Sequence, residues 1–259
     1  MSKQSDNTID NCRYFRVLPD FDRKCKECSL SNNTAVGGHT YSKIENTKLI
    51  VIAAYPGRLE VEKNLSLFPN QRSTDKVLDA PNAGRLFKAS IVRKFDQCKR
   101  IPDSLKPFYS KIMFTNMIKC HPFNYKYEKA SIRTKNIRSC KEKWLVREIE
   151  EVSKFNPTCP ILLCGSEATK LLGEKKTVYS NRRKVFYYKN THPVLVTFNP
   201  IELCRYNPKI IVEQTYQYNG KLSVKEVKPK SPIVIGSTMW HWNRDLELLK
   251  EIVIDSLKV

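Results

Sequence analysis

The feature that most constrains the fold is a near-continuous apolar run, KLIVIAA, at Lys48–Ala54. Runs of this kind are typical of strands that are buried on both faces of a parallel sheet. Three further short apolar runs follow, at Lys111–Phe114, Ile161–Gly165 and Val194–Phe198. Helical patterns separate the runs, and a strand–helix–strand order predicts a parallel sheet covered by helices. We therefore expect an α/β fold, a three-layer α/β/α arrangement with a central four-stranded parallel sheet.

The expected helices fill the intervals between these runs. Asn82 can cap a helix that extends to about Phe95, because its side chain can accept a backbone N–H at the helix start. The other expected helices cover Ile137–Phe155, Ser166–Leu172 and Leu246–Leu257. Alternating residues around Asn219 and Gly220 predict an added hairpin within Lys209–Val227.

The chain is strongly basic: 46 Lys and Arg against 26 Asp and Glu give a net charge of +20. Such an excess attracts polyanions, so nucleic acid is the expected partner, with a merely solvated basic surface as the alternative. No run approaches the ~18–20 apolar residues that span a bilayer, and the amino terminus lacks the apolar segment of a secretion signal. Nine cysteines in such a chain favour thiols and metal ligands in a reducing compartment, cytoplasmic or nuclear.

The second apolar run leads to Asn116, and Cys120 follows four residues later. The carboxyl ends of strands are where open α/β sheets bind ligands. Cys120 has three candidate companions, the Cys25-x-x-Cys28 pair and Cys140. Four thiolates suit either zinc or an iron–sulfur cluster, and ligand chemistry alone does not choose between them. The other five cysteines are interpreted as buried or incidental thiols.

Several motifs occur in an order known from one family. TNMIKCHP at Thr115–Pro122 is similar to that family's T-N-x-x-K-C-R-P motif, and Cys140 is similar to the cysteine that starts its next helix. The Cys-x-x-Cys pair and three further segments also fit in order, namely Ala83–Leu86, Leu163–Ala168 and Val196–Pro200. On these residues, the chain resembles the iron–sulfur uracil-DNA glycosylases, family 4 of their superfamily, over about Cys25–Pro208.

The resemblance implies a monomeric, DNA-binding protein with a structural [4Fe–4S] cluster, zinc being the alternative. The implied metal ligands are Cys25, Cys28, Cys120 and Cys140. Residues 1–22 are expected to be a flexible segment, and residues 23–208 a glycosylase domain that includes the cluster. The hairpin and closing helix of residues 209–259 are expected to pack on the same domain.

The resemblance and the local chemistry together single out site residues. The expected catalytic residues are Glu60, Asn116 and Asn199. The expected base pocket is formed by Ala54, Tyr55, Gly57 and Asp79. The expected DNA contacts are Asn82, Arg85, Leu203, Arg205, Arg182 and Arg183. Leu203 is the candidate wedge that replaces the flipped base in the duplex, and Arg205 is the candidate for a phosphate contact.

Each catalytic candidate has a physical role, and Asn116 and Glu60 also have a structural alternative. Asn116 can donate to and accept from the polar edge of a pyrimidine, or it can be a turn residue after a strand. Glu60 can orient water or stabilise a cationic sugar, or it can be a solvated loop acid. Asn199 can donate to the anion that develops on the departing base. His192 precedes the fourth strand and so is expected at the opposite end of the sheet from the site.

Three departures from the family pattern bear on the substrate. Ala53-Ala54-Tyr55 stands where the family has an acidic residue, Val77-Leu78-Asp79 where it has a base-stacking aromatic ring, and Asn199 where it has histidine. Together they predict a DNA glycosylase for a larger, more polar base than uracil. One branch of the superfamily removes glucosylated hydroxymethylcytosine from phage DNA as a defence, and the altered pocket is similar in kind. The alternatives are a uracil-DNA glycosylase of base-excision repair, a catalytically inactive DNA-binding relative and a zinc-stabilised nucleic-acid adaptor.

Overall fold

The structure, a computed structural model, places most of the chain. It describes residues 6–9, 12–26, 28, 30, 35–57, 60–61, 64–66, 83–121, 130–173, 176–206 and 238–258. The predicted hairpin within Lys209–Val227 lies outside these residues, as do Asp79 and Asn82.

The described strands form one sheet in the order β1-β2-β3-β5-β4-β6-β8-β7. Their bounds are β1 (Asp6–Ile9), β2 (Cys12–Arg16), β3 (His39–Thr40), β4 (Leu49–Ala53), β5 (Ile112–Asn116), β6 (Ile161–Cys164), β7 (Val185–Tyr188) and β8 (His192–Thr197). The four central strands, β5, β4, β6 and β8, run parallel to one another. They coincide with the four predicted apolar runs, so the central four-stranded parallel sheet is confirmed.

The core lies on both faces of this sheet because successive strand residues point to opposite sides. In β4, Ile50 and Ile52 pack in one cluster with Leu145 and Ile149. Leu49 and Val51 pack in the other cluster, whose helical members include Phe87, Trp242 and Leu246. All five residues of β4 are buried, as expected for a strand covered by helices on both faces.

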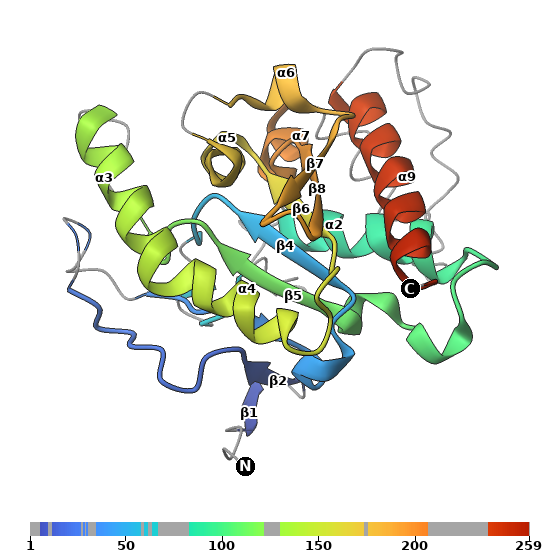
Figure 1. Cartoon of the computed structure of the whole chain (residues 1–259), viewed down its shortest axis with the longest axis horizontal. Helices are drawn as coiled ribbons and strands as arrows, with labels where there is room; N and C mark the ends of the chain where they lie inside the picture. The colour runs from blue at the N-terminus through green and yellow to red at the C-terminus, as the bar shows by residue number, and fades with distance from the viewer. Residues whose placement is uncertain are drawn as a thin grey trace, which may run out of the picture.

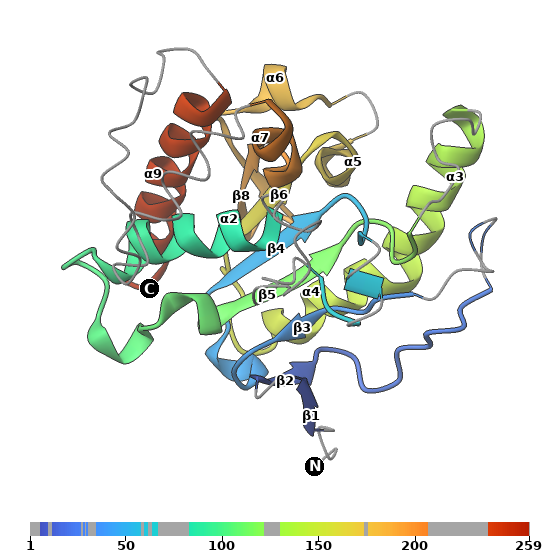
Figure 2. The same cartoon turned by 180° about the vertical axis from the view of Figure 1, so that it is seen from behind.

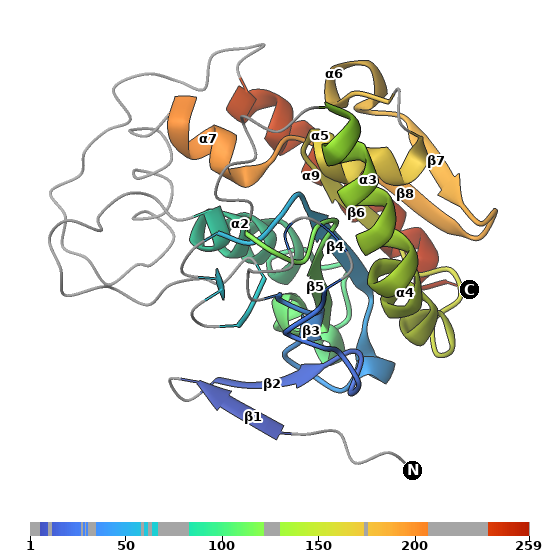
Figure 3. The ribbon, with the colours of Figure 1, turned by 90° about the vertical axis from the view of Figure 1, so that its left-hand side faces the viewer.

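Helices form the two outer layers. Their bounds are α2 (Ala83–Ile91), α3 (Ala130–Cys140), α4 (Val146–Ser153), α5 (Ser166–Thr169), α6 (Val178–Asn181), α7 (Pro200–Tyr206) and α9 (Thr238–Ser256). A π-helical turn, Lys141–Leu145, joins α3 to α4 into one long rod. Figure 1 looks onto the face covered by α4 and Figure 2 onto the face covered by α2, and Figure 3 shows β4 and β5 between them. The three-layer α/β/α arrangement is therefore confirmed.

The edges of the sheet differ from the prediction. β1, β2 and β3 extend the sheet beyond β5 as antiparallel strands, although residues 1–22 were expected to be flexible. Tyr14 and Val17 are buried there, so this polar segment is held by a few apolar anchors. At the other edge, β7 pairs antiparallel with β8 within the basic stretch that gave no strand signal. Its residues alternate between exposed and half-buried, but all four are apolar or aromatic, so the sequence shows no alternation of apolar and polar residues.

The helices mostly occur where they were expected. The long helix over Ile137–Phe155 is present and begins earlier, at Ala130. The closing helix α9 also begins earlier than predicted, at Thr238, and it packs along β8. In the part of the chain that the structure describes, no helix combines the length and the apolar character needed to cross a membrane.

Candidate active site at the carboxyl ends of the parallel strands

The segments that leave β4 and β5 continue side by side beyond the sheet. The Met117 N–H donates to the Ala53 carbonyl at 2.8 Å, and the Ile118 N–H donates to the Ala54 carbonyl at 3.0 Å. Nδ1 of His121 lies 2.8 Å from the Pro56 carbonyl oxygen. These contacts bring the Ala54–Gly57 turn, predicted to form part of the base pocket, next to the segment that begins at Asn116.

Within that turn, Ala54 is buried and Tyr55 is partly exposed. The ring of Tyr55 lies edge-on to His121, with 6.4 Å between the ring centroids. An alanine at position 54 leaves more space than a larger side chain would, and Tyr55 adds a partly exposed aromatic ring to the turn.

Asn116 is the last residue of β5, and its side chain is fully buried. Its Nδ2 donates to Oγ of Ser66 at 2.6 Å, which fixes the orientation of the amide. Its Oδ1 is buried and has no hydrogen-bond partner among the described residues. Leaving a buried acceptor unsatisfied costs about 1–3 kcal/mol, so this oxygen is an acceptor that a bound group with an N–H would satisfy.

Glu60 is held by hydrogen bonds to two neighbouring backbone N–H groups, one of which belongs to the residue before Ser66. Its Oε2 accepts a hydrogen bond from the Gly57 N–H, and its backbone carbonyl accepts from the Leu65 N–H at 3.0 Å. Leu65 precedes Ser66, the partner of Asn116. The backbone of Glu60 is thus connected through Leu65 and Ser66 to the Asn116 amide.

Asn199, the third predicted catalytic residue, follows β8 and immediately precedes α7. Its Oδ1 accepts from the Ile201 N–H at 3.1 Å, so it caps the helix. Its side chain also lies against Gly165, where a Cβ would come within 3.1 Å of the Asn199 Cβ. Gly165 has φ +93°, a conformation that favours glycine. The cap uses the acceptor of Asn199, and Nδ2 is the atom that can donate to another group.

Asn116 and Asn199 both lie at the carboxyl ends of the parallel strands, but their strands are not neighbours. β4 and β6 separate their strands, and neighbouring strands are about 4.8 Å apart, so roughly 14 Å separates the two strand ends. His192, by contrast, begins β8 at the opposite edge, where its nitrogens contact Ser153 and the Cys159 carbonyl. This placement agrees with its predicted absence from the site.

A buried ionic network that was not predicted lies beneath Asn116. The Lys119 ammonium and the Thr115 hydroxyl both contact Oε2 of Glu148 at 2.6 Å. Oε1 of Glu148 accepts the Gly38 N–H at 2.7 Å. Lys119 and Glu148 are both buried. Thr115 and Lys119 belong to the motif around Asn116, and this network accounts for both residues; the motif was the only sequence signal that could have indicated it.

The four predicted metal ligands converge next to this network. Cys25, Cys120 and Cys140 are buried and Cys28 is half-buried. Cys140 is hydrogen-bonded to Cys28, and Cys120 interacts electrostatically with both Cys28 and Cys25. The Trp144 indole N–H points at Sγ of Cys25, 3.4 Å away.

Backbone hydrogen bonds connect the segment that carries Cys25 and Cys28 to the segment that carries Cys120. The Val36 N–H donates to the Lys119 carbonyl at 2.7 Å, and the Ala35 N–H donates to the Arg23 carbonyl at 3.0 Å.

The contact with Cys28 and burial raise the pKa of the Cys140 thiol far above its usual range. Burial, with the charges of Cys28 and Cys25, raises the pKa of Cys120 to about 12. Within the described residues, no three His, Cys, Asp or Glu side chains are arranged to hold a single metal ion.

The residues predicted to contact DNA differ in their burial and in their contacts. Arg182 forms a two-pronged ion pair with buried Asp245, both contacts being 3.0 Å long, so its guanidinium is engaged inside the protein. Arg183 is exposed. Leu203, a residue of α7, is fully buried in the core, and this placement contradicts the prediction that it is the wedge that replaces the flipped base. The side chains of Arg85 and Arg205 lie outside the described part, although their backbones are in α2 and α7.

The fold and this rim define an α/β protein with a polar site at the carboxyl ends of parallel strands. Residues 39–222 match the family model described as the Uracil DNA glycosylase superfamily. Because that match covers more than half of the chain, the chain belongs to this superfamily, whose members are DNA glycosylases. The match includes Cys120 and Cys140 but begins after Cys25 and Cys28. No curated protein sequence matches the chain.

Proposed function

We propose that this protein is a monofunctional DNA glycosylase that excises a modified pyrimidine from a flipped nucleotide. Water adds to C1′ as the C1′–N bond breaks, and the departing base takes a proton, which leaves an abasic site. The observation that carries the proposal is the side chain of Asn116. It stands at a strand end, buried and oriented by Ser66, with a carbonyl oxygen that has no partner among the described residues. Such an oxygen suits an N–H on the polar edge of a base.

The other two candidates supply complementary chemistry. Asn199, with its oxygen used by the cap on α7, has Nδ2 as its donor for the negative charge that develops on the base carbonyl. The carboxylate of Glu60 is anchored to the Gly57 N–H and suits the orientation of water or the stabilisation of a cationic sugar.

The substrate we favour is larger and more polar than uracil. Small Ala53 and Ala54 replace the family's acidic position, and Asn199 replaces its histidine. Asp79, which lies outside the described residues, stands where the family has a stacking ring. Glucosylated hydroxymethylcytosine in phage DNA matches these changes, and its removal would be a form of antiviral defence. Uracil excision in repair is the alternative.

The decisive experiment is a substrate panel. The protein is incubated with oligonucleotides that carry uracil, hypoxanthine, hydroxymethylcytosine or glucosylated hydroxymethylcytosine, and abasic sites are then cleaved with alkali. We expect cleavage of the glucosylated substrate, loss of cleavage in Asn116→Ala and no loss in Asn156→Ala. Asn156 is a matched control because its amide contacts the Thr47 carbonyl before β4, at the other edge of the sheet. Cleavage of uracil alone would refute the choice of base, and no cleavage of any substrate would refute the enzyme.

A catalytically inactive DNA-binding relative is the second candidate function. The observation that favours it is that Glu60 and Asn199 both engage neighbouring backbone N–H groups, which explains their side chains without catalysis. This candidate predicts salt-dependent DNA binding, no abasic product and no effect of Asn116→Ala in any cellular assay.

We also propose that the four neighbouring thiols hold a [4Fe–4S] cluster. The chemistry of the donor set supports the proposal, because the cluster takes one thiolate on each of its four iron atoms. Cys28 interacts with both Cys120 and Cys140, Cys120 also interacts with Cys25, and the Trp144 indole N–H lies beside Cys25. When bound, the cluster would cross-link the Cys25–Cys28 segment to the strand that carries Asn116.

The cluster proposal is tested by colour and composition. Anaerobically purified protein should absorb broadly near ~400 nm and contain iron and acid-labile sulfide. Cys140→Ala should lose both. Cys159→Ala removes an equally buried thiol that lies away from the group, and it should keep them. A colourless protein that contains one zinc per chain would support the zinc alternative and overturn the proposal.

A further inference from the structure

One arginine–aromatic surface includes Arg183, a predicted DNA contact, together with residues of α9 that were not predicted to bind DNA. It comprises Arg183, Trp240, His241 and Arg244, and we refer to it as the Trp240 surface. The guanidinium carbons of Arg183 and Arg244 lie 5.0 Å and 5.1 Å from the centroid of the Trp240 ring. Arg183 also contacts Nδ1 of His241 at 3.3 Å. One indole therefore holds two cations, and both arginines are exposed.

The charge of this surface is not neutralised within the described residues. Arg183 and Arg244 form no ion pair there. Asp245, which follows Arg244 in the sequence, is buried and already paired with Arg182, and it also accepts the Thr197 hydroxyl at 2.8 Å. Two full positive charges thus remain side by side, against their mutual repulsion.

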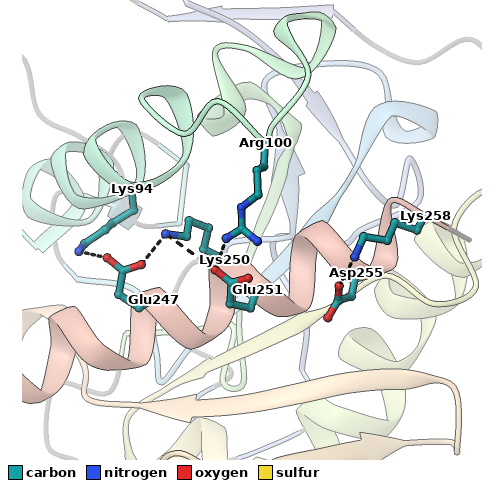
Figure 4. A network of polar contacts seen from close by, with 7 residues as sticks. All are labelled: Lys94, Arg100, Glu247, Lys250, Glu251, Asp255 and Lys258. Atoms are coloured by element: carbon teal, nitrogen blue, oxygen red, sulfur yellow. Dashed lines mark hydrogen bonds and ion pairs between the residues drawn. The ribbon is translucent and has the colours of Figure 1, made fainter.

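The rest of α9 shows the opposite arrangement (Figure 4). Towards its carboxyl end, each cation that the figure draws faces an acid of the helix. The pairs are Lys94–Glu247, Lys250–Glu247, Arg100–Glu251 and Lys258–Asp255. Among the described residues of α9, the arginine charge without an ion-pair partner therefore lies at its amino-terminal end.

That end of α9 lies at the rim that carries the candidate site. Asp245 contacts Thr197, the last residue of β8, so the helix residues that precede Asp245 extend past the end of the strand. The ring of His241 lies 6.3 Å from that of Phe198, the neighbour of Asn199. Figures 1 and 2 show this end of α9 close to α6 and α7. Tyr179, an exposed residue of α6, packs edge-on against the same Phe198 ring.

The backbone at Arg183 gives an independent sign of function. Arg183 has φ +60°, in the left-handed region that side chains other than glycine and asparagine rarely adopt. Strained residues are enriched at binding sites, where the surrounding structure holds them in place. This conformation lets the two consecutive arginines point in different directions, so that Arg182 contacts buried Asp245 and Arg183 stacks on Trp240.

We infer that the Trp240 surface binds the phosphodiester backbone of DNA beside the target nucleotide, through the guanidinium groups of Arg183 and Arg244. A guanidinium that stacks on an indole keeps its N–H edge free, and that edge matches two oxygens of a phosphate. Stacking also pre-organises both side chains, so less freedom is lost on binding. The inference rests on the proposed function insofar as it takes DNA as the partner.

The test compares two double variants of the full chain. Arg183→Ala/Arg244→Ala removes the two uncompensated charges, and Arg100→Ala/Lys258→Ala removes two ion-paired charges from the other end of α9. Affinity for a duplex oligonucleotide is measured from 50 to 200 mM salt. Two lost phosphate contacts should reduce the salt-dependent fall in affinity by about 12-fold over this range. The control should keep the wild-type slope. Equal slopes for the two double variants would overturn the inference.

A third variant separates stacking from charge. Trp240→Ala keeps both arginines but removes the ring that holds them, and it should weaken binding at every salt concentration. Circular dichroism confirms that each variant is folded. Unchanged affinity in Trp240→Ala would show that the ring does not organise the arginines, and would overturn that part of the inference.

Failure of this inference is distinguishable from failure of the proposed enzyme. If the wild-type protein excises no base, the slopes still show whether the surface binds DNA. If the wild type excises a base and the arginine variant binds with an unaltered slope, the enzyme stands and the surface does not. In an active protein, loss of the two arginines should raise KM for the duplex substrate, because both residues are proposed to bind its phosphates.

Discussion

The Lys119 ammonium lies 2.6 Å from Oε2 of Glu148, and both side chains are buried. The pair joins distant parts of the chain: Lys119 lies between Asn116 and Cys120, while Glu148 is in α4 and accepts the Gly38 N–H. A Cβ on Gly38 would come within 2.9 Å of the Glu148 carboxyl carbon, so only glycine fits there without rearrangement. The ion pair thus fixes the segment that links the Asn116 amide to Cys120 and its neighbouring thiols.

Breaking this pair should destabilise the protein strongly. Lys119→Met leaves the Glu148 carboxylate buried and without its cation, and such a loss costs about 3–5 kcal/mol. Chemical denaturation measures the change. The double variant Lys119→Met/Glu148→Leu should lose clearly less than the sum of the two single variants, because neither charge is then left alone. Additive losses would show that the two residues do not act as a pair.

Arg182 and Arg183 are adjacent, yet their substitution should have opposite consequences. Arg182→Ala leaves buried Asp245 without its cation, at a cost of about 3–5 kcal/mol in the free energy of unfolding. Arg183→Ala removes an exposed side chain and should change that free energy by no more than about 0.5 kcal/mol. Thermal denaturation of the two variants decides the matter. Equal melting temperatures would contradict the roles assigned from the Asp245 contacts.

The parallel core could be predicted because its signal is local. Each central strand is a short apolar run, and such a run is by itself the sequence signal of a strand that is buried on both faces. The edge strands could not be predicted in the same way. β2 carries arginine and tyrosine, and β7 mixes exposed and half-buried residues, so their pairing depends on neighbours that are distant in the sequence.

The site residues also differ in how far a local sequence signal predicts their positions. The position of Asn116 follows from the end of its strand, and the approach of the four cysteines follows from a motif. The burial of Leu203 does not follow, because an apolar residue in a short helix looks the same as a wedge or as core. The engagement of Arg182 and Lys119 depends on Asp245 and Glu148, which are 63 and 29 residues away in the sequence.

His39 should make stability depend on pH. It is fully buried, stacked on Phe114, and its nitrogens have no partner in the described structure. Burial, and then the charge of Arg16, lower its pKa well below 6.5. The unfolded chain therefore binds one more proton below about pH 6.5, and stability falls on acidification by up to about 1.4 kcal/mol per pH unit. Above pH 6.5 this contribution is complete.

His39→Phe provides the comparison for this pH effect. Phenylalanine keeps the stack on Phe114 and the edge contacts with Tyr14 and Tyr41, but it cannot titrate. Unfolding free energies at pH 7 and pH 5 should differ less in the variant than in the wild type, and the other titrating groups cancel in that difference. An identical loss in both proteins would mean that His39 is not the group responsible.

The amide of Asn116 should matter for catalysis more than for DNA binding. Its Oδ1 has no partner among the described residues, and Ser66 holds its Nδ2, so Asn116→Ala removes a base contact and leaves the phosphate contacts intact. We expect kcat/KM for the excised base to fall on the order of 10²-fold, the scale of one lost oriented hydrogen-bonding group. Ser66→Ala keeps the amide but frees its orientation, so the loss should be smaller, about 10-fold, for a positioning contact of about 1–1.5 kcal/mol. Single-turnover excision and DNA affinity are measured on the same preparations. A loss of affinity as large as the loss of rate would show that Asn116 acts in binding the DNA and not in recognising the base.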